Sequence, residues 1–270
     1  MSPFVDKLSA VSARNNSFVC VGLDPDPDRF PDHLKASDDA IFEFNRAIIE
    51  QTSDLVCAYK LNLAFYEVSG PRGLESMEKT LKLIPDEVVV IADAKRGDLG
   101  NSARMYAQAL FEYFGFDGAT VNPYQGRDAV QPFLDYQDKG VFVLCLTSNA
   151  SARDIQDLTV NGHPLYMEIA SAVRSWNTNG NAGLVVGATN AESLSHIRSV
   201  APDMPLLVPG IGAQGGDLAA VMQAGPDQEG GGLLINSSRG IIHASSEPDF
   251  AEVARVAAIT LRDEINALRR

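Results

Sequence analysis

The sequence predicts one (β/α)8 TIM barrel, a single domain over residues 1–270, and three observations lead to this fold class. Eight short apolar runs have the length and the Val, Ile and Leu content of buried parallel strands. Segments with helical spacing of apolar residues alternate with these runs, and 270 residues is a usual length for one barrel. A doubly wound sheet would also alternate, but eight strands in such a sheet are rarer.

Most of the predicted strands end at Asp, Asn, Gly or Pro residues, which interrupt regular structure. The predicted strands cover residues 18–23, 55–61, 87–93, 118–122, 141–146, 182–187, 205–209 and 232–235. The predicted helices cover residues 38–51, 71–84, 100–114, 127–136, 165–177, 215–224 and 249–267, with one more after Asn190, its expected N-cap. Residues 150–162 are polar and are expected to form an irregular excursion above a strand end.

The composition restricts the possible partners. The net charge of -13 argues against nonspecific binding to nucleic acid or to an anionic membrane surface. Cys20, Cys57 and Cys145 lie in apolar runs and form no CxxC pair, so buried thiols are expected. The first residues lack the apolar core of a signal peptide, and no apolar stretch is long enough to span a bilayer. The sequence therefore predicts a cytoplasmic protein.

The most informative segment is residues 93–98, Asp-Ala-Lys-Arg-Gly-Asp, at the end of the third predicted strand. Strand alternation places Asp93 and Lys95 on one face, about 6–7 Å apart. A carboxylate at the end of a buried strand needs a partner, and Lys95 is the obvious one. Asp98 lies in the following loop, from which it can turn back or reach a neighbouring subunit. A solvated loop can have the same composition, but the apolar strand before Asp93 favours a functional site.

Polar side chains also follow the other predicted strands. Active sites of such barrels form at the carboxyl ends of the strands, so these side chains should converge. The residues at or just past strand ends are Asp24, Lys60, Asp93, Lys95, Asn122, Ser148, Gln214 and Arg239.

Two loops have the composition of a phosphate site. Phosphate groups in these barrels often bind after the seventh and eighth strands, at backbone N–H groups and a helix N-terminus. Residues 209–216 supply Gly210, Gly212 and Gln214, and residues 237–240 supply Ser238 and Arg239. The glycines would also suit plain tight turns, but both loops occupy the two expected positions. The sequence lacks a GxxxxGK[ST] motif, and no GxGxxG follows the first strand.

Taken together, the motifs resemble the orotidine 5'-phosphate decarboxylases of the bacterial branch called type 2. Residues 93–98, with Asn101 and Ser102 after them, match the signature of that branch. The other matching segments are residues 21–25, 59–62, 121–124, 209–216 and 237–241. DxKxxD alone is shared with other phosphosugar barrels, whereas the whole set is specific. Gln125 departs from the family pattern, which has Leu after the tyrosine.

The resemblance implies conversion of orotidine 5'-monophosphate (OMP) to UMP and CO2, the last step of de novo pyrimidine synthesis, without cofactor or metal. It implies a homodimer with active sites at the interface. Lys95 would deliver the proton to C6 of the pyrimidine, and Asp93 would lie against the substrate carboxylate. Lys60 and Asp24 would bind the ribose hydroxyls, and Lys60 would also hold Asp93.

The remaining roles follow from the same resemblance. Asp98 would cross into the partner's site, accompanied by Ser102. Ser148 would meet the pyrimidine, although Thr147 could take this role. Gln214 and Arg239 would hold the phosphate. Asn122, Gly210, Gly212 and Ser238 complete the expected substrate contacts, and the loops 150–162, 212–216 and 225–231 are candidates for closure.

Two alternatives remain open at this point. A metal-dependent phosphosugar aldolase or decarboxylase, such as hexulose-phosphate synthase, would place an acid on the second strand to help bind Mg2+. This chain has Lys60 there, and a cation opposes metal binding. The other alternative is a barrel that binds phosphate without catalysis. A buried row of lysines and aspartates argues against it, because such a row is costly to keep. The four histidines form no pattern of metal ligands.

Overall fold

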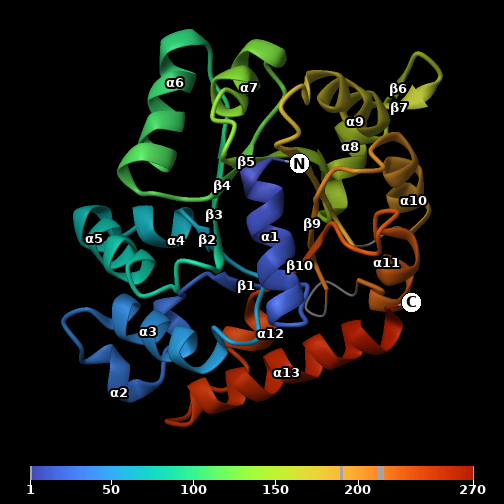
Figure 1. The fold of residues 1–270 in the computed structure, drawn as a ribbon. Coiled ribbons are helices and arrows are strands. Elements are labelled where there is room, and N and C mark those ends of the chain that lie inside the picture. The colour runs from blue at the N-terminus through green and yellow to red at the C-terminus, as the bar shows by residue number, and fades with distance from the viewer. Residues whose placement is uncertain (1, 189–190, 212–215, 270) are drawn as a thin grey trace.

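The computed structural model describes residues 2–188, 191–211 and 216–269. Within these ranges, eight parallel strands close into a barrel in the order β1-β10-β9-β8-β5-β4-β3-β2 (Figure 1), which confirms the predicted fold class. The strands are β1 Val19–Leu23, β2 Ala58–Asn62, β3 Val89–Arg96, β4 Gly118–Val121, β5 Gly140–Leu146, β8 Ala182–Val186, β9 Leu206–Pro209 and β10 Leu233–Ser237.

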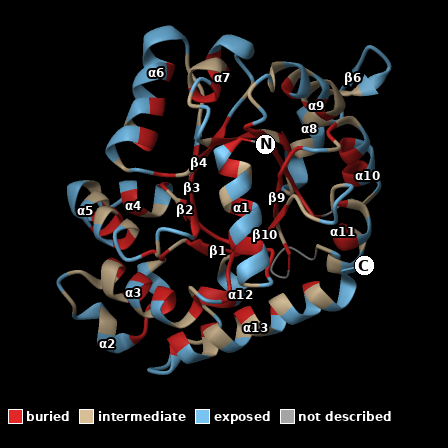
Figure 2. Cartoon of the chain, viewed as in Figure 1, coloured by how far each residue is buried: buried red, intermediate tan, exposed pale blue. Residues whose placement is uncertain are grey.

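Helices surround the barrel and cover the outer faces of its strands. Because the strands are covered on the outside and packed on the inside, they are mostly buried, as Figure 2 shows in red. The main helices are α3 Ala40–Thr52, α5 Gly70–Leu81, α6 Gly100–Gln108, α7 Arg127–Leu134, α9 Leu165–Trp176, α10 Ala191–Val200, α11 Leu218–Ala224 and α13 Phe250–Leu268. A π-helical turn, Ala109–Tyr113, continues α6. Each predicted helix is present, although α11 begins later than expected, and Asn190 lies outside the described residues.

The N-terminal helix α1 (Pro3–Arg14), which was not predicted, lies across the barrel (Figure 1). Its Phe4 ring packs edge-on against Phe142, with ring centroids 5.7 Å apart. A Cβ atom on Gly140 would lie 2.6 Å from this ring, so the glycine leaves the space that Phe4 fills. Since Gly140 begins β5, α1 closes the amino-terminal end of the barrel. The shorter helices α2 Asp32–Lys35, α4 Ala64–Glu67 and α12 Arg239–Ile242 and the 3-10 turn Pro27–Arg29 were also not predicted.

The excursion after β5 is more regular than expected. The 3-10 turn Ala150–Ala152 leads into helix α8, Arg153–Gln156. Strands β6 (Thr159–Val160) and β7 (His163–Pro164) then pair antiparallel. Asn161 and Gly162 connect them with φ values of 52° and 85°, as a two-residue Asn-Gly hairpin requires. The prediction of an irregular segment was therefore wrong, and the Asn-Gly pair was the signal for the hairpin.

The third strand also differs from the prediction, because β3 continues through the charged residues to Arg96. Ala92 pairs with Ala119 of β4, but the next pair joins Arg96 to Val121. Four steps along β3 thus match two steps along β4, and the extra residues form a bulge. Bulges of this kind redirect side chains and are common beside active sites.

A buried arginine anchors the bases of the last two barrel strands. The guanidinium of Arg198, on α10, donates hydrogen bonds to the carbonyl oxygens of Gly225, Met204 and Gly232, at distances of 2.8, 2.7 and 3.4 Å. These carbonyls lie at the end of α11 and just before β9 and β10. Burial lowers the pKa of Arg198 to about 10, so the side chain remains charged at neutral pH. Arg198 therefore fixes the strands that lead to the predicted phosphate loops.

None of the helices in the described ranges is both long enough and apolar enough to cross a membrane.

Candidate active site

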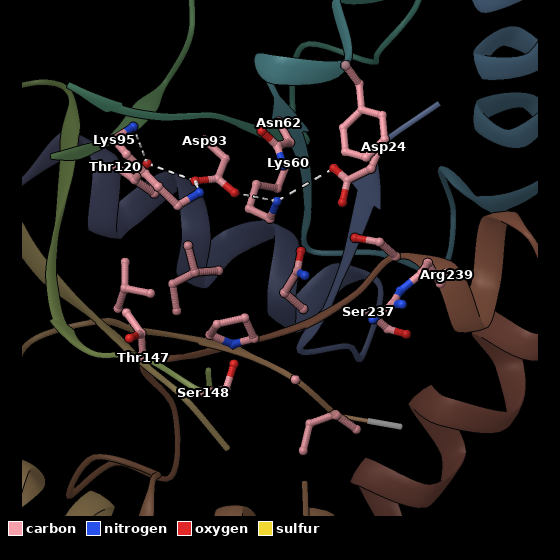
Figure 3. A pocket seen from close by; sticks show the side chains of 18 of the residues that line it. Asp24, Lys60, Asn62, Asp93, Lys95, Thr120, Thr147, Ser148, Ser237 and Arg239 are labelled. Carbon is pink, nitrogen blue, oxygen red and sulfur yellow. Dashed lines mark hydrogen bonds and ion pairs between the residues drawn. The ribbon is translucent and has the colours of Figure 1, made fainter. Parts of the chain in front are cut away.

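A cavity of about 570 Å3 opens at the carboxyl ends of the barrel strands (Figure 3). Most of the predicted site residues converge there, although they come from strands far apart in the sequence. Those that line the cavity are Asp24, Lys60, Asp93, Lys95, Ser148, Gly210, Ser238 and Arg239.

Four of these side chains form a charge row, Asp24–Lys60–Asp93–Lys95, in which the sign alternates (Figure 3). Nζ of Lys60 lies 2.9 Å from Oδ2 of Asp93 and 3.7 Å from Oδ1 of Asp24. Nζ of Lys95 donates to the other oxygen of Asp93, Oδ1, at 2.6 Å. Each charge thus has a neighbour of opposite sign, which is what buried ions require.

Burial differs along the charge row. The side chains of Lys60 and Asp93 are only 4% and 11% exposed, whereas that of Lys95 is 50% exposed. Lys60 and Asp93 therefore form the fixed part of the row. Lys95 reaches into the open cavity, where its ammonium group can meet a bound molecule.

The surroundings keep these groups ionised. Burial by itself would raise the pKa of Asp93, but the charges and hydrogen bonds of Lys60 and Lys95 outweigh it and hold that pKa well below its ordinary value. Burial would lower the pKa of Lys60, but the carboxylates of Asp24 and Asp93 raise it above its ordinary value. At neutral pH both groups are therefore charged.

Lys95 reaches the charge row through the bulge in β3. Its φ of 48° is in the left-handed region, which is uncommon for lysine. Its backbone N–H donates to Oγ1 of Thr120 on β4 at 2.9 Å. Asp93 and Lys95 thus face the same cavity, as predicted, but through a bulge and not through regular alternation. Thr120 also lines the cavity and was missed from the sequence, although it was a polar residue in an apolar run.

The predicted phosphate end of the cavity is built on β9 and β10. Gly210 follows β9 with a φ of 101°, which favours glycine, and Ser238 and Arg239 follow β10. A Cβ atom on Gly22 would lie 1.8 Å from Oγ of Ser238, so Gly22 makes room for this side chain. Gly212 and Gln214 lie outside the described residues.

Two further residues that line the cavity were missed from the sequence. Arg29 lines the cavity together with Arg239, so two guanidinium groups border it. His243 also lines it, and its Nε2 lies 3.3 Å from the backbone oxygen of Asp24. Burial lowers the pKa of His243, so the imidazole is neutral at neutral pH. These residues come from the loop after β1 and the end of α12, which approach each other only in the folded chain.

At the other end of the cavity, Thr147 and Ser148 follow β5. Oγ1 of Thr147 donates to Oδ1 of Asn149 at 2.7 Å and accepts from Nε2 of Gln156 at 2.9 Å. The backbone N–H of Thr147 donates to Oε1 of the same glutamine at 2.8 Å. The Thr147 hydroxyl is thus used in holding α8 against the end of β5.

Three predicted residues lie outside the lining of the cavity. Oδ1 of Asp98 accepts from the N–H of Leu99 at 2.7 Å, and Ser102 is exposed on α6. Asn122 is exposed, and its Oδ1 accepts from the N–H of Tyr124 at 3.0 Å. None of the three therefore contributes to the cavity of its own chain.

Among the described residues, no group of three or more His, Cys, Asp or Glu side chains has the arrangement of a metal site. Two of the three acids that line the cavity, Asp24 and Asp93, have the Lys60 ammonium between them. The three cysteines are buried free thiols, as predicted.

Comparison with known proteins agrees with this geometry. The model of the orotidine 5'-phosphate decarboxylase / HUMPS family matches residues 17–254, which include all eight barrel strands. The chain belongs to this family. It is 50% identical over 268 residues to orotidine 5'-phosphate decarboxylase of Azoarcus sp. (strain BH72), covering 98% of this chain and 99% of the relative. It is 48% identical over 270 residues to the enzyme of that name from Ralstonia pickettii (strain 12J), with the same coverage.

A solved structure supports the same assignment. The structure of Leishmania donovani OMP decarboxylase superposes with a TM-score of 0.87 and 40% identity, and the match covers 100% of this chain and 99% of that one. The resemblance drawn from the sequence motifs is thus confirmed for the family. The charge row lies just after β1 (Asp24), on β2 (Lys60) and on β3 (Asp93 and Lys95), inside the part of the chain that the decarboxylase family matches.

Proposed function

We propose that this chain decarboxylates OMP to UMP and CO2, the last step of de novo pyrimidine synthesis. The observation that carries the proposal is the charge row Asp24–Lys60–Asp93–Lys95 at the strand ends of the cavity. Relatives that are 48–50% identical over nearly the whole chain are named orotidine 5'-phosphate decarboxylase. The chain is accordingly an enzyme, a carboxy-lyase.

The chemistry of the reaction explains why such a row is needed. Loss of CO2 from C6 of the pyrimidine leaves an electron pair in the plane of the ring, where the π system cannot delocalise it. The remaining means of stabilisation is electrostatic, namely a fixed positive charge where negative charge develops. The Lys95 ammonium extends into the cavity and is held by Asp93. It can stabilise the developing charge and then act as the general acid that protonates C6.

The other members of the row prepare the site before the substrate arrives. In this proposal Asp93 lies next to the carboxylate that leaves, while Lys60 and Asp24 bind the ribose hydroxyls. Since Asp93 stays ionised, it repels the substrate carboxylate, and this repulsion raises the free energy of the bound substrate relative to the transition state. Because these residues supply both the charge and the proton, the mechanism uses no cofactor.

The phosphate group of OMP would occupy the end of the cavity that Ser238 and Arg239 border, beside the backbone at Gly210. Gln214 belongs to the same proposed contact set. A guanidinium can bind two phosphate oxygens at once, so Arg239 is the strongest candidate for this role. Ser148, at the other end, is proposed to contact the pyrimidine. The energy of the phosphate contacts then contributes to transition-state stabilisation at the distant C6.

Replacement of Arg239 by alanine should therefore lower kcat/KM for OMP on the order of a hundredfold or more. This fall corresponds to a loss of several kcal/mol of transition-state stabilisation. Steady-state kinetics on the purified variant would measure this. The matched control is Arg46→Ala on α3, an exposed arginine paired with Glu43 away from the cavity. If orotidine without its phosphate is decarboxylated as well as OMP by the native enzyme, the phosphate assignment is wrong.

We also propose that the chain works in the cytoplasm as a homodimer with shared active sites. The exposed face of α6, shown in pale blue in Figure 2, supports this proposal. Leu99, Ser102 and Tyr106 follow one another at helical spacing on that face, and Leu99 and Tyr106 are exposed apolar residues. Tyr124, in the neighbouring loop after β4, is 87% exposed. An apolar surface of this kind, next to Asp98, fits a second copy that receives Asp98 and Ser102 in its own cavity.

Ultraviolet absorbance gives the direct test of the function, because OMP and UMP absorb differently. The purified chain should consume OMP in the presence of EDTA at the same rate as without it, since the Lys60 ammonium occupies the place between Asp24 and Asp93. No consumption of OMP under either condition would reject the proposed function. Activity that EDTA abolishes and Mg2+ restores would favour the metal-dependent aldolase class instead.

A further inference from the structure

We propose that Thr120 is a positioning residue for the decarboxylation, which sets Asp93 and Lys95 in their working geometry through a single hydroxyl group. The inference rests on the proposed function, because it assigns a role in that reaction. Thr120 lies on β4, is 1% exposed, and faces the cavity beside both charged residues (Figure 3).

The Thr120 hydroxyl both donates and accepts a hydrogen bond with the segment that carries Asp93 and Lys95. Oγ1 of Thr120 donates to Oδ1 of Asp93 at 2.9 Å. The same oxygen accepts the backbone N–H of Lys95, also at 2.9 Å. A threonine hydroxyl has one hydrogen, so the donor is committed to Asp93 and a lone pair to Lys95. Thr120 thus acts on the reaction through these two residues.

The backbone at Lys95 explains why such a contact is needed. Among the described residues other than glycine, only Asn16, Lys95 and Asn161 have a positive φ. Asparagine tolerates this conformation, whereas lysine rarely adopts it. The bulge between Ala92 and Arg96 takes Lys95 out of the regular pairing with β4. The Thr120 hydroxyl supplies the acceptor for the Lys95 N–H and so holds the strained turn in place.

The same hydroxyl fixes the carboxylate. Oδ1 of Asp93 accepts from Thr120 and from Nζ of Lys95, while Oδ2 accepts from Lys60. Donors from three directions leave the carboxylate little freedom to rotate. Removal of the hydroxyl would release one bond to Oδ1 and the backbone of Lys95 together. The distance between the Lys95 ammonium and the reacting carbon would then vary. Imprecise placement of this group slows catalysis without preventing binding.

The test compares Thr120→Val, which keeps the shape and loses the hydroxyl, with Thr120→Ser, which keeps the hydroxyl. In Thr120→Val, kcat for OMP should fall about 10- to 100-fold, the effect of losing a hydrogen bond to a charged group. KM for OMP and the Kd of UMP should change little, because the phosphate and ribose contacts remain. Thr120→Ser should restore kcat to near the native value.

A second readout does not depend on turnover. The groups around Asp93 are Lys60 on β2, Lys95 on its own strand, Asp24 beyond Lys60, and the buried thiol of Cys20. All remain in both variants, so the loss of the Thr120 donor should raise the pKa of Asp93 in Thr120→Val and not in Thr120→Ser. NMR titration of isotope-labelled carboxyl groups in the free protein would measure it. The acid limb of the kcat profile should move to higher pH in the valine variant.

Thr80→Val is the matched control, because it removes another buried threonine hydroxyl, one that donates to the carbonyl of Ser76 on α5. This variant should keep the native kcat.

The inference is overturned if Thr120→Val keeps the native kcat, or if Thr120→Ser loses as much activity as Thr120→Val. It is also overturned if Thr120→Val loses UMP binding together with kcat, since the role is then only structural. If the valine variant does not fold, the test rests on kcat and on the pKa of Asp93 in Thr120→Ser. A fall in kcat or a raised pKa of Asp93 in that variant contradicts the inference. A native enzyme that leaves OMP unchanged would refute the proposed function, while the titration would still test the hydrogen bond.

Discussion

Replacement of Lys95 by alanine should lower kcat for OMP by at least about a thousandfold, because two contributions disappear together. The ammonium group no longer faces the carbon at which negative charge develops, and no general acid remains at that position. Each contribution alone is typically worth a hundredfold or more. Because Lys95 is half exposed in the cavity and is not part of the core, the chain should still fold.

The rest of the charge row should survive this substitution. Asp93 keeps the Lys60 ammonium at 2.9 Å and the Thr120 hydroxyl at 2.9 Å. Lys95 is one of the charges that lower the pKa of Asp93, so this pKa should rise in the variant. UMP should still bind, since the proposed ribose and phosphate contacts come from other residues. Stopped assays over long times would measure the residual kcat, and calorimetry would measure the binding of UMP.

Lys82→Ala is the control for the loss of a lysine, because Lys82 is exposed at the end of α5, outside the lining of the cavity. It should retain the native kcat. If Lys95→Ala remains within about tenfold of the native kcat, a different group must deliver the proton to C6. In that case the proposed role of Lys95 is incorrect even if the reaction is the one proposed.

Much of the barrel was predictable because buried parallel strands have a distinctive composition. The eight apolar runs correspond to the eight barrel strands, with differences only at their ends. The pattern could not reveal where β3 ends, since Asp93 and Lys95 alternate as in an ordinary strand. The bulge depends on the pairing with β4, and hence on contacts between residues distant in sequence. One segment alone therefore predicted that the strand ends at Asp93, whereas β3 continues to Arg96.

The site residues also divide into those that the sequence predicts and those whose position depends on the folded chain. Charged residues at strand ends, such as Lys60 and Arg239, were found because the fold class states where a barrel has its site. Thr120, Arg29 and His243 were missed because their position depends on side-chain direction and on short helices. Asn122 follows β4, but its side chain is exposed and its Oδ1 accepts from the N–H of Tyr124. It lies beyond the last residue of the strand, where the alternation that directs Thr120 toward the cavity no longer applies. A position just past a strand end therefore does not decide where a side chain points.

The helix α1 was predictable in principle. Phe4, Leu8 and Val11 have the spacing of one apolar helix face, and Pro3 suits the first turn. A barrel of this class is expected to begin with a strand, and residues 18–23 fit that expectation. The helix that precedes this strand was therefore not predicted, although its own pattern is clear.

A second prediction concerns the sharing of each active site between the two subunits of the dimer. Lys95→Ala and Asp98→Ala should each be nearly inactive alone, and a mixture that is dissociated and reassembled should regain about a quarter of the native activity. In a heterodimer of the two variants, one site carries both defects. The other site has Lys95 from one chain and Asp98 from its partner, so it is native. Random reassortment at equal amounts gives half heterodimers, each with one native site of two.

The structure gives a reason to expect this result. Asp98 does not line the cavity of its own chain, and it precedes the exposed face of α6 that carries Leu99 and Tyr106. If Asp98 served its own chain, neither variant in the mixture could form a native site, and no activity would return. The control is reassembly of each variant with itself, which should recover nothing. Separation of differently tagged chains would show that heterodimers form. Heterodimers that form and remain inactive would therefore place Asp98 in its own subunit's site and rule out the shared arrangement.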